Sequence, residues 1–193
     1  MRIPAIPPGE LSEEQKPLYD DMSDEMGGYF SGFIKKRKDG ALLGPWAPAL
    51  QYPSFGKPWW DNIKAIAENP KLPRLTREVA ILATGAHFKA GYELYSHTAI
   101  GESIHLDSDK IATIAAGQRP NDLTREEGIA YSVATSLASG GRLPEATWIM
   151  AVDEFGEDGA AELIFLIAGY HQLSAILNGF DVGIPSEETL GGL

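Results

Sequence analysis

The chain contains no cysteine. That absence excludes disulfides, thiolate metal ligands, iron–sulfur clusters and thiol redox catalysis. Basic residues are also scarce, because 16 Lys and Arg stand against 27 Asp and Glu, for a formal net charge of −11. An acidic chain repels phosphate backbones and anionic lipid surfaces, so we expect neither nucleic acid nor a membrane as a partner. The one basic run, residues 35–38, is interpreted as a solvated loop rather than a binding patch.

Long uninterrupted apolar runs are missing as well. The N-terminal MRIPAIPPGE has no hydrophobic region of the signal-peptide type, and the most apolar run, residues 163–177, is interrupted by His171 and Gln172. A composition of 44% hydrophobic and 22% charged residues is typical of a soluble globular protein. We therefore expect a soluble, cytoplasmic chain of 193 residues that forms one domain around a single core.

The spacing of apolar residues predicts the fold class. No stretch alternates apolar and polar residues over several positions, whereas spacings of three and four recur, so the predicted class is all-α. Within the domain 1–193 we expect an N-terminal arm, helix and loop over 1–58, a helical core over 59–182 and a peripheral tail over 183–193.

Local start and stop signals predict the helix boundaries. Ser12 with Gln15 and Thr124 with Glu127 fit capping boxes, Thr76 is a candidate N-cap, and Gly, Pro or Asn residues mark the ends. The predicted helices cover residues 12–26, 59–69, 76–91, 92–103, 108–117, 124–139, 144–155 and 158–179.

Residues 27–58 form an aromatic segment, rich in Gly and Pro, that shows no helical period apart from a short turn near 47–51. Long loops of this kind often serve as lids or oligomer contacts. Two interpretations stay open: the aromatics pin the loop to the core, or they form a wall that faces substrate. The aromatics of this segment and of the two residues that follow it are Tyr29, Phe30, Phe33, Trp46, Tyr52, Phe55, Trp59 and Trp60.

Titratable residues concentrate between residues 75 and 104. Glu93 and His97 are four residues apart, so on a helix they share one face. Glu78 belongs to the preceding predicted helix and can approach the same face if the chain folds back at Gly91. Two carboxylates that flank one histidine suit general acid–base catalysis near neutral pH, and two close carboxylates resist ionising together.

Two other interpretations of these residues stay open. Glu93 and His97 can form an ordinary solvent-facing helix pair that contributes a few tenths of a kcal/mol, about 0.2–0.5. Glu78, Glu93 and His97 could also ligate zinc or non-haem iron, although no HExxH or paired ExxH motif is present. We predict no metal site.

Four stretches in this order, LTREVAIL, GYELYSH, IATIAAG and ELIFLIAGYHQLSAILNGF, resemble the carboxymuconolactone decarboxylase and alkylhydroperoxidase-D-like (AhpD-like) family. The resemblance is strongest from Glu78 to His97 and extends loosely from Ile3 to Pro185. It implies a compact AhpD-like domain with an antiparallel helical core that assembles as a homo-oligomer, a trimer or a hexamer.

The peroxidase branch of that family uses a Cys-x-x-Cys pair served by a Glu and a His at the places of Glu78 and His97. Here those cysteine places hold Ala90 and Glu93. The chain therefore resembles the cysteine-free decarboxylase branch, which acts without metal or organic cofactor on a lactone acid. The resemblance implies that His97 carries the proton, Glu78 orients it and Glu93 is a second acid or base, although the two glutamates can exchange roles.

The resulting functional prediction is a cofactor-free lyase, a decarboxylase acting on a small cyclic or lactone-type carboxylic acid. A non-enzymatic ligand-binding protein of the same fold is the alternative, and peroxide detoxification is disfavoured because no thiol is present. A carboxylate substrate needs a nearby cation, for which the basic residues around the motif are candidates, and neighbouring rings can form pocket walls or core contacts. The candidate substrate-binding residues are Arg77, His87, Tyr92, Tyr95 and His171.

Overall fold

The computed structural model describes residues 1–26, 32–68 and 70–186 of the chain. Within these ranges the chain is all-helical, with eight α-helices and no strand, which confirms the predicted class. The helices are α1 (Lys16–Glu25), α2 (Trp46–Gln51), α3 (Pro53–Glu68), α4 (Arg74–Phe88), α5 (Gly91–Ser103), α6 (Ser108–Ala115), α7 (Arg125–Ala138) and α8 (Glu145–Gly179), preceded by a 3₁₀ turn at Pro8–Glu10.

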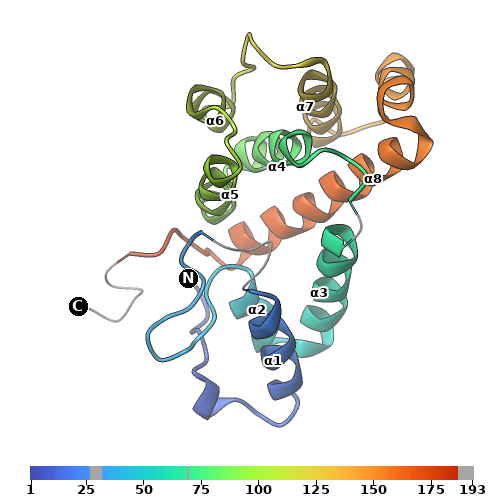
Figure 1. Ribbon diagram of the computed structural model, residues 1–193. Coiled ribbons are helices and arrows are strands. Elements are labelled where there is room, and N and C mark those ends of the chain that lie inside the picture. Colours follow the sequence, from blue (N-terminus) through green and yellow to red (C-terminus); the bar gives the residue numbers. More distant parts are fainter. Residues whose placement is uncertain (27–31, 69, 187–193) are drawn as a thin grey trace.

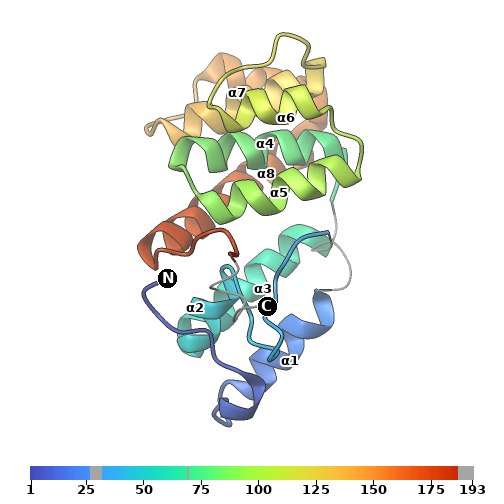
Figure 2. The same ribbon diagram turned by 90° about the vertical axis from the view of Figure 1, so that its left-hand side faces the viewer.

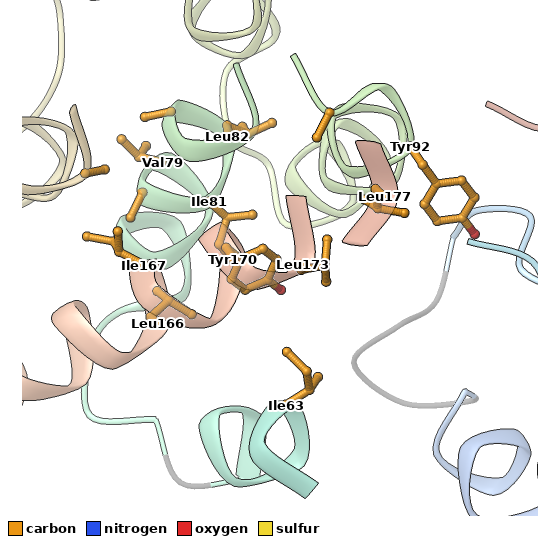
Figure 3. Packing of buried hydrophobic residues seen from close by; sticks show 14 of the residues in the cluster. Ile63, Val79, Ile81, Leu82, Tyr92, Leu166, Ile167, Tyr170, Leu173 and Leu177 are labelled. Carbon is orange, nitrogen blue, oxygen red and sulfur yellow. The ribbon is translucent and has the colours of Figure 1, made fainter. Parts of the chain in front are cut away.

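Helix α4 is the centre of the arrangement and packs against α5, α6, α7 and α8. Figures 1 and 2 show α4–α8 as one bundle, with α1, α2 and α3 gathered beside it. A helix that is apolar all round must be buried, and α4 has an apolar run from Val79 to Ala83 in which every residue is buried. Figure 3 shows the core formed where Ile81 of α4 meets Leu166 and Ile167 of α8.

Helix α8 consists of two helical segments, as the sequence predicted. Gly156 has φ 70° and ψ 172°, which no helix accommodates, and it separates the segments. By length and composition alone, α8 is the one helix in the described ranges that could cross a membrane. Several of its apolar residues, including Leu163 and Leu166, are fully buried in the core, as is typical of the core helix of a globular domain.

The hydrogen bonds of both predicted capping boxes are present, but only Thr124 caps a helix; the predicted helix start at Ser12 is wrong, because α1 begins at Lys16, after the turn that Ser12 and Gln15 close. The backbone N–H of Glu127 donates to Thr124 Oγ1 at 3.2 Å, and that of Gln15 donates to Ser12 Oγ at 3.3 Å. The predicted cap at Thr76 is wrong, because α4 begins two residues earlier and Thr76 is buried inside it. Because α4 begins at Arg74, the Thr76 N–H belongs to the first turn, whose backbone N–H groups have no acceptor within the helix. The Thr76 side chain is buried in the core.

The turn between α4 and α5 lies slightly before the predicted Gly91. Helix α4 ends at Phe88, and Lys89 adopts the left-handed conformation with φ 53°. Its N–H and that of Ala90 satisfy the last carbonyls of α4, as in a helix C-cap. This short connection folds α5 back along α4.

The predicted helix from Trp59 begins six residues earlier, at Pro53. Helices α2 and α3 are separated only by Tyr52, and a Cβ on Gly56 would lie 2.0 Å from the Ala49 carbonyl oxygen, so only glycine permits this close approach. Pro58 lies in the second turn of α3, where it removes one backbone donor. The predicted loop is therefore much shorter, and Tyr29, Phe30 and the tail residues 187–193 lie outside the described residues.

Candidate active site

Glu78 and His97 meet between α4 and α5. The His97 Nδ1 atom lies 2.7 Å from Glu78 Oε2, and the two residues are 4% and 0% exposed. One proton shared along this contact fixes the orientation of the imidazole ring, and the edge of Tyr170 packs against the ring at a centroid distance of 5.0 Å. The remaining ring nitrogen, Nε2, makes no hydrogen bond to the described part of the chain. The structure thus brings together the two residues that the sequence placed nineteen positions apart.

Glu93 lies one turn before His97 on α5 and is 1% exposed. Its Oε2 accepts a hydrogen bond from Ser174 Oγ of α8 at 2.5 Å, while its buried Oε1 has no partner among the described residues. Burial raises the pKa of Glu93 from 4.5 to about 8, against the opposing effect of the Ser174 hydrogen bond. The carboxyl group is therefore protonated at neutral pH.

The cause of this protonation differs from the sequence argument. The sequence suggested that a second nearby carboxylate would keep one glutamate protonated, whereas burial is the dominant cause in the structure. Two contacts that define the Glu93 environment were not predicted. Ser174 is a small polar residue in the largely apolar second segment of α8, and a Cβ on Gly85 of α4 would lie 2.9 Å from Glu93 Oε1. Helical periodicity carries no signal for either.

A small cavity of about 20 Å³ lies against Glu93 and His97. This volume holds one or two water molecules, since a water needs roughly 10–15 Å³ by this measure. Apart from Glu93, Ser96 and His97 the walls are apolar or aromatic, and they come from both halves of the chain. The other lining residues are Phe33, Pro45, Trp46, Trp59, Trp60, Ile63, Tyr92, Tyr170 and Leu173.

The aromatic segment is packed against the core, and some of its side chains also line the cavity. Phe33 stacks on the buried Trp46 at a centroid distance of 6.2 Å, which ties the segment to the core, and both rings also line the cavity. Trp59 and Trp60 of α3 extend this wall.

The tyrosines of α5 anchor the chain just before α2. The Tyr92 hydroxyl donates to the Ile34 carbonyl at 2.8 Å, and the Tyr95 hydroxyl accepts from the Ile34 N–H at 3.0 Å. Tyr92 lines the cavity, and burial raises the pKa of its hydroxyl. Tyr95 is not a lining residue but packs edge-on against Phe33 at 6.3 Å.

Arg77 does not reach this cavity. Its guanidinium forms a buried ion pair with Glu162 of α8 and donates to the Ile66 carbonyl at 2.9 Å. This position contradicts the prediction that Arg77 binds a substrate carboxylate, because its charge is directed at the junction of α3, α4 and α8. No Lys or Arg is among the described residues that line the cavity.

His87 and His171 also lie outside the cavity lining. The ring of Phe88 packs between them, at centroid distances of 5.0 Å from His87 and 4.9 Å from His171. His87 is exposed, and burial together with the charge of His87 lowers the pKa of His171. Their positions argue against direct substrate contact. Over the ranges that the structure describes, no group of three or more His, Asp or Glu is arranged to hold a metal ion.

Comparisons with known proteins define the class by fold. No family model matches the chain, and no curated protein matches it. Solved structures match over nearly the whole chain. One is a cysteine-to-alanine variant of the debrominase Bmp8 in complex with 2,3,4-tribromopyrrole. It has a TM-score of 0.71 at 15% identity and covers 98% of this chain and 96% of that one. The apo form of Bmp8 gives a TM-score of 0.71 at 16% identity, covering 93% and 94%.

A third solved structure gives the fold its name. The AhpD core of an uncharacterized peroxidase-related protein from Ralstonia eutropha JMP134 has a TM-score of 0.69 at 16% identity and covers 99% of this chain and 95% of that one. The chain therefore has the AhpD-like fold, and these neighbours include enzymes. At such identities the likeness establishes the fold, while the chemistry must be argued from the site.

Proposed function

We propose that this chain is a cofactor-independent acid–base enzyme that releases CO₂ from a small carboxylic acid. One observation supports the proposal above all others. A carboxyl group that burial keeps protonated, Glu93, and a histidine held by a buried glutamate, His97, line the same largely apolar cavity. Such a combination of a poised acid and an oriented imidazole is typical of catalytic sites rather than of ordinary helix packing.

The chemistry follows from the protonation states. Loss of CO₂ leaves an electron pair on the substrate, and the Glu93 O–H donates the proton that the substrate takes up. The products are the protonated substrate fragment, CO₂ and the Glu93 carboxylate, which regains its proton before the next turnover. Apolar walls favour this step, because they disfavour the localised charge of the substrate carboxylate relative to the dispersed charge of the transition state.

His97 is the group that meets the substrate carboxylate in this proposal. With no Lys or Arg among the described lining residues, the imidazole is the hydrogen-bonding partner that we assign to the carboxylate in the cavity. Glu78 holds Nδ1, so Nε2 is the nitrogen that contacts the ligand. The absence of cysteine leaves no thiolate for peroxidase chemistry, which argues against a hydroperoxide as substrate. Because a neighbour of the same fold binds 2,3,4-tribromopyrrole, planar heterocyclic acids belong among the candidate substrates.

The test is CO₂ release from a panel of lactone acids and pyrrole carboxylic acids, followed by mass spectrometry of the gas. We expect Glu93→Gln and His97→Gln to reduce turnover by a factor of about 10²–10⁴, the usual contribution of a general acid or base. His87→Gln is the matched control, because it is exposed and does not line the cavity, and it should keep wild-type turnover.

A second readout does not depend on the choice of substrate. The protonated carboxyl of Glu93 should give an infrared C=O band at neutral pH that disappears in Glu93→Gln. Undiminished CO₂ release by Glu93→Gln would refute the proposed mechanism, and the absence of the band would remove the acid on which it depends.

A further inference from the structure

A second cavity adjoins the candidate active site. This cavity, called the outer groove below, has a volume of about 270 Å³ and lies between α2, α3 and the end of α8. Trp59 lines both this outer groove and the inner cavity, so the two cavities meet at this residue. The side chains that form the outer groove include Tyr52, Phe55, Trp59, Gln172, Ile176 and Phe180.

The volumes of the two cavities decide where a substrate can lie. A cavity of about 150 Å³ holds one benzene molecule, so the inner cavity of about 20 Å³ is too small for any ring. The outer groove, at about 270 Å³, has room for a bicyclic molecule. Any cyclic substrate of Glu93 must therefore place most of its body beyond the inner cavity.

The outer groove offers aromatic surfaces to such a body. Tyr52 and Phe180 are stacked at a centroid distance of 5.8 Å, and Phe55 beside them is 79% exposed, an unusual exposure for a phenylalanine. A planar apolar ligand would cover these rings and remove their surface from water.

Trp59 provides the polar contact. The residue is only 4% exposed, and its Nε1–H is buried without a hydrogen-bond partner among the described residues. A buried donor left unpaired is costly, and a ligand oxygen at either of the cavities that Trp59 lines would satisfy it. Glu93, whose buried Oε1 also has no partner among the described residues, is another residue of the inner cavity lining.

We propose that the outer groove is the apolar subsite of the same site and that Trp59 is a substrate-positioning residue. The ligand class is a bicyclic or longer aryl carboxylic acid. Its rings lie against Tyr52, Phe55 and Phe180, and one carboxylate oxygen accepts the Trp59 N–H at the entrance to the inner cavity. This inference deepens the proposed function, because it names the substrate class of that site.

Binding of two probes, 2-naphthoate and benzoate, tests the subsite by isothermal titration calorimetry. We expect 2-naphthoate to bind at least tenfold more tightly than benzoate, because its second ring is buried in the outer groove. Phe55→Ala should weaken 2-naphthoate about fivefold and leave benzoate nearly unchanged. Phe165→Ala is the matched control, because Phe165 is 68% exposed on α8 and does not line the groove. Equal affinity of the wild type and Phe55→Ala for 2-naphthoate, or no binding at millimolar concentration, would overturn the subsite.

The role of Trp59 has its own readouts. Trp59→Phe keeps an aromatic ring but removes the donor, so both probes should bind about tenfold more weakly. In the wild type, the indole N–H resonance of Trp59, assigned by its loss in Trp59→Phe, should move downfield when either probe binds. An unmoved resonance at saturation would refute the hydrogen bond, whatever the variant does to folding.

These binding measurements separate the subsite from the catalytic proposal. Glu93→Gln should bind both probes, because it removes the acid and leaves Trp59 and the outer groove intact. Probe binding without CO₂ release from any acid would refute the proposed function alone. CO₂ release without probe binding in the outer groove would refute this inference alone.

Discussion

Replacing Glu93 by Gln should make the protein more stable at neutral and alkaline pH. Glutamine keeps the size of the side chain and an oxygen that accepts from Ser174, but it has no proton to lose. In the wild type, burial raises the pKa of Glu93 from 4.5 to about 8. Between these two values the folded chain holds a proton that the unfolded chain has released, so the free energy of unfolding falls as the pH rises.

The size of the effect follows from linkage. Each pH unit within this window lowers the free energy of unfolding of the wild type, relative to Glu93→Gln, by about 1.4 kcal/mol. Across the window the difference accumulates to an amount on the order of 4–5 kcal/mol, and it levels off above the pKa of about 8. Below pH 4.5 both side chains are neutral in both states, and the two proteins should differ by a constant amount.

Urea denaturation of both proteins at each pH from 4 to 9 measures this difference, and subtraction removes most contributions from the other titrating groups. Glu102→Gln is the matched control, because Glu102 lies on the same helix with its side chain exposed, and its difference should stay nearly constant. A constant difference between the wild type and Glu93→Gln from pH 5 to 8 would show that Glu93 is ionised when folded, and it would refute the argument from burial.

Two further variants test how the Glu93 environment is built. Gly85→Ala places a Cβ 2.9 Å from Glu93 Oε1, so we expect a destabilisation of about 1–2 kcal/mol by urea denaturation, despite the gain in helix propensity. A stabilised variant would show that the carboxyl group moves aside freely. Ser174→Ala removes the hydrogen bond that opposes the effect of burial on the pKa of Glu93. A ¹³C NMR titration should therefore give a pKa of Glu93 above about 8 in this variant. A lower pKa would contradict the assigned role of Ser174.

Local signals in the sequence predicted the helices well where a side chain acts on its own backbone. Examples are the capping box formed by Thr124 and Glu127 and the break between the two segments of α8 at Gly156. Capping and backbone conformation depend on neighbours in sequence. The start of α3 was missed for a tertiary reason. Its first turn is held by the close approach of Gly56 to Ala49, and no local pattern in a Gly- and Pro-rich stretch reports that contact.

The candidate site divides in the same way. The approach of Glu78 to His97 could be predicted from the sequence, because a chain that folds back near Gly91 brings the two helices together. The positions of Arg77, His87 and His171 could not be predicted in this way. Arg77 pairs with Glu162 and His171 contacts Phe88, and both contacts depend on how α8 packs against α4. Closeness in sequence to Glu78, Glu93 and His97 therefore did not predict which basic residues line the cavity.

By itself, the sequence determined the all-α class, the helix caps and the exclusion of thiol chemistry, since these depend on composition and on neighbours a few residues apart. Only the tertiary structure decided that Glu93 is protonated and that Trp59 lines two cavities. A pKa depends on how completely a carboxyl group is removed from water, and that is set by side chains from α4 and α8 that are distant in sequence. The shape of a cavity is likewise a property of packed helices rather than of any one of them.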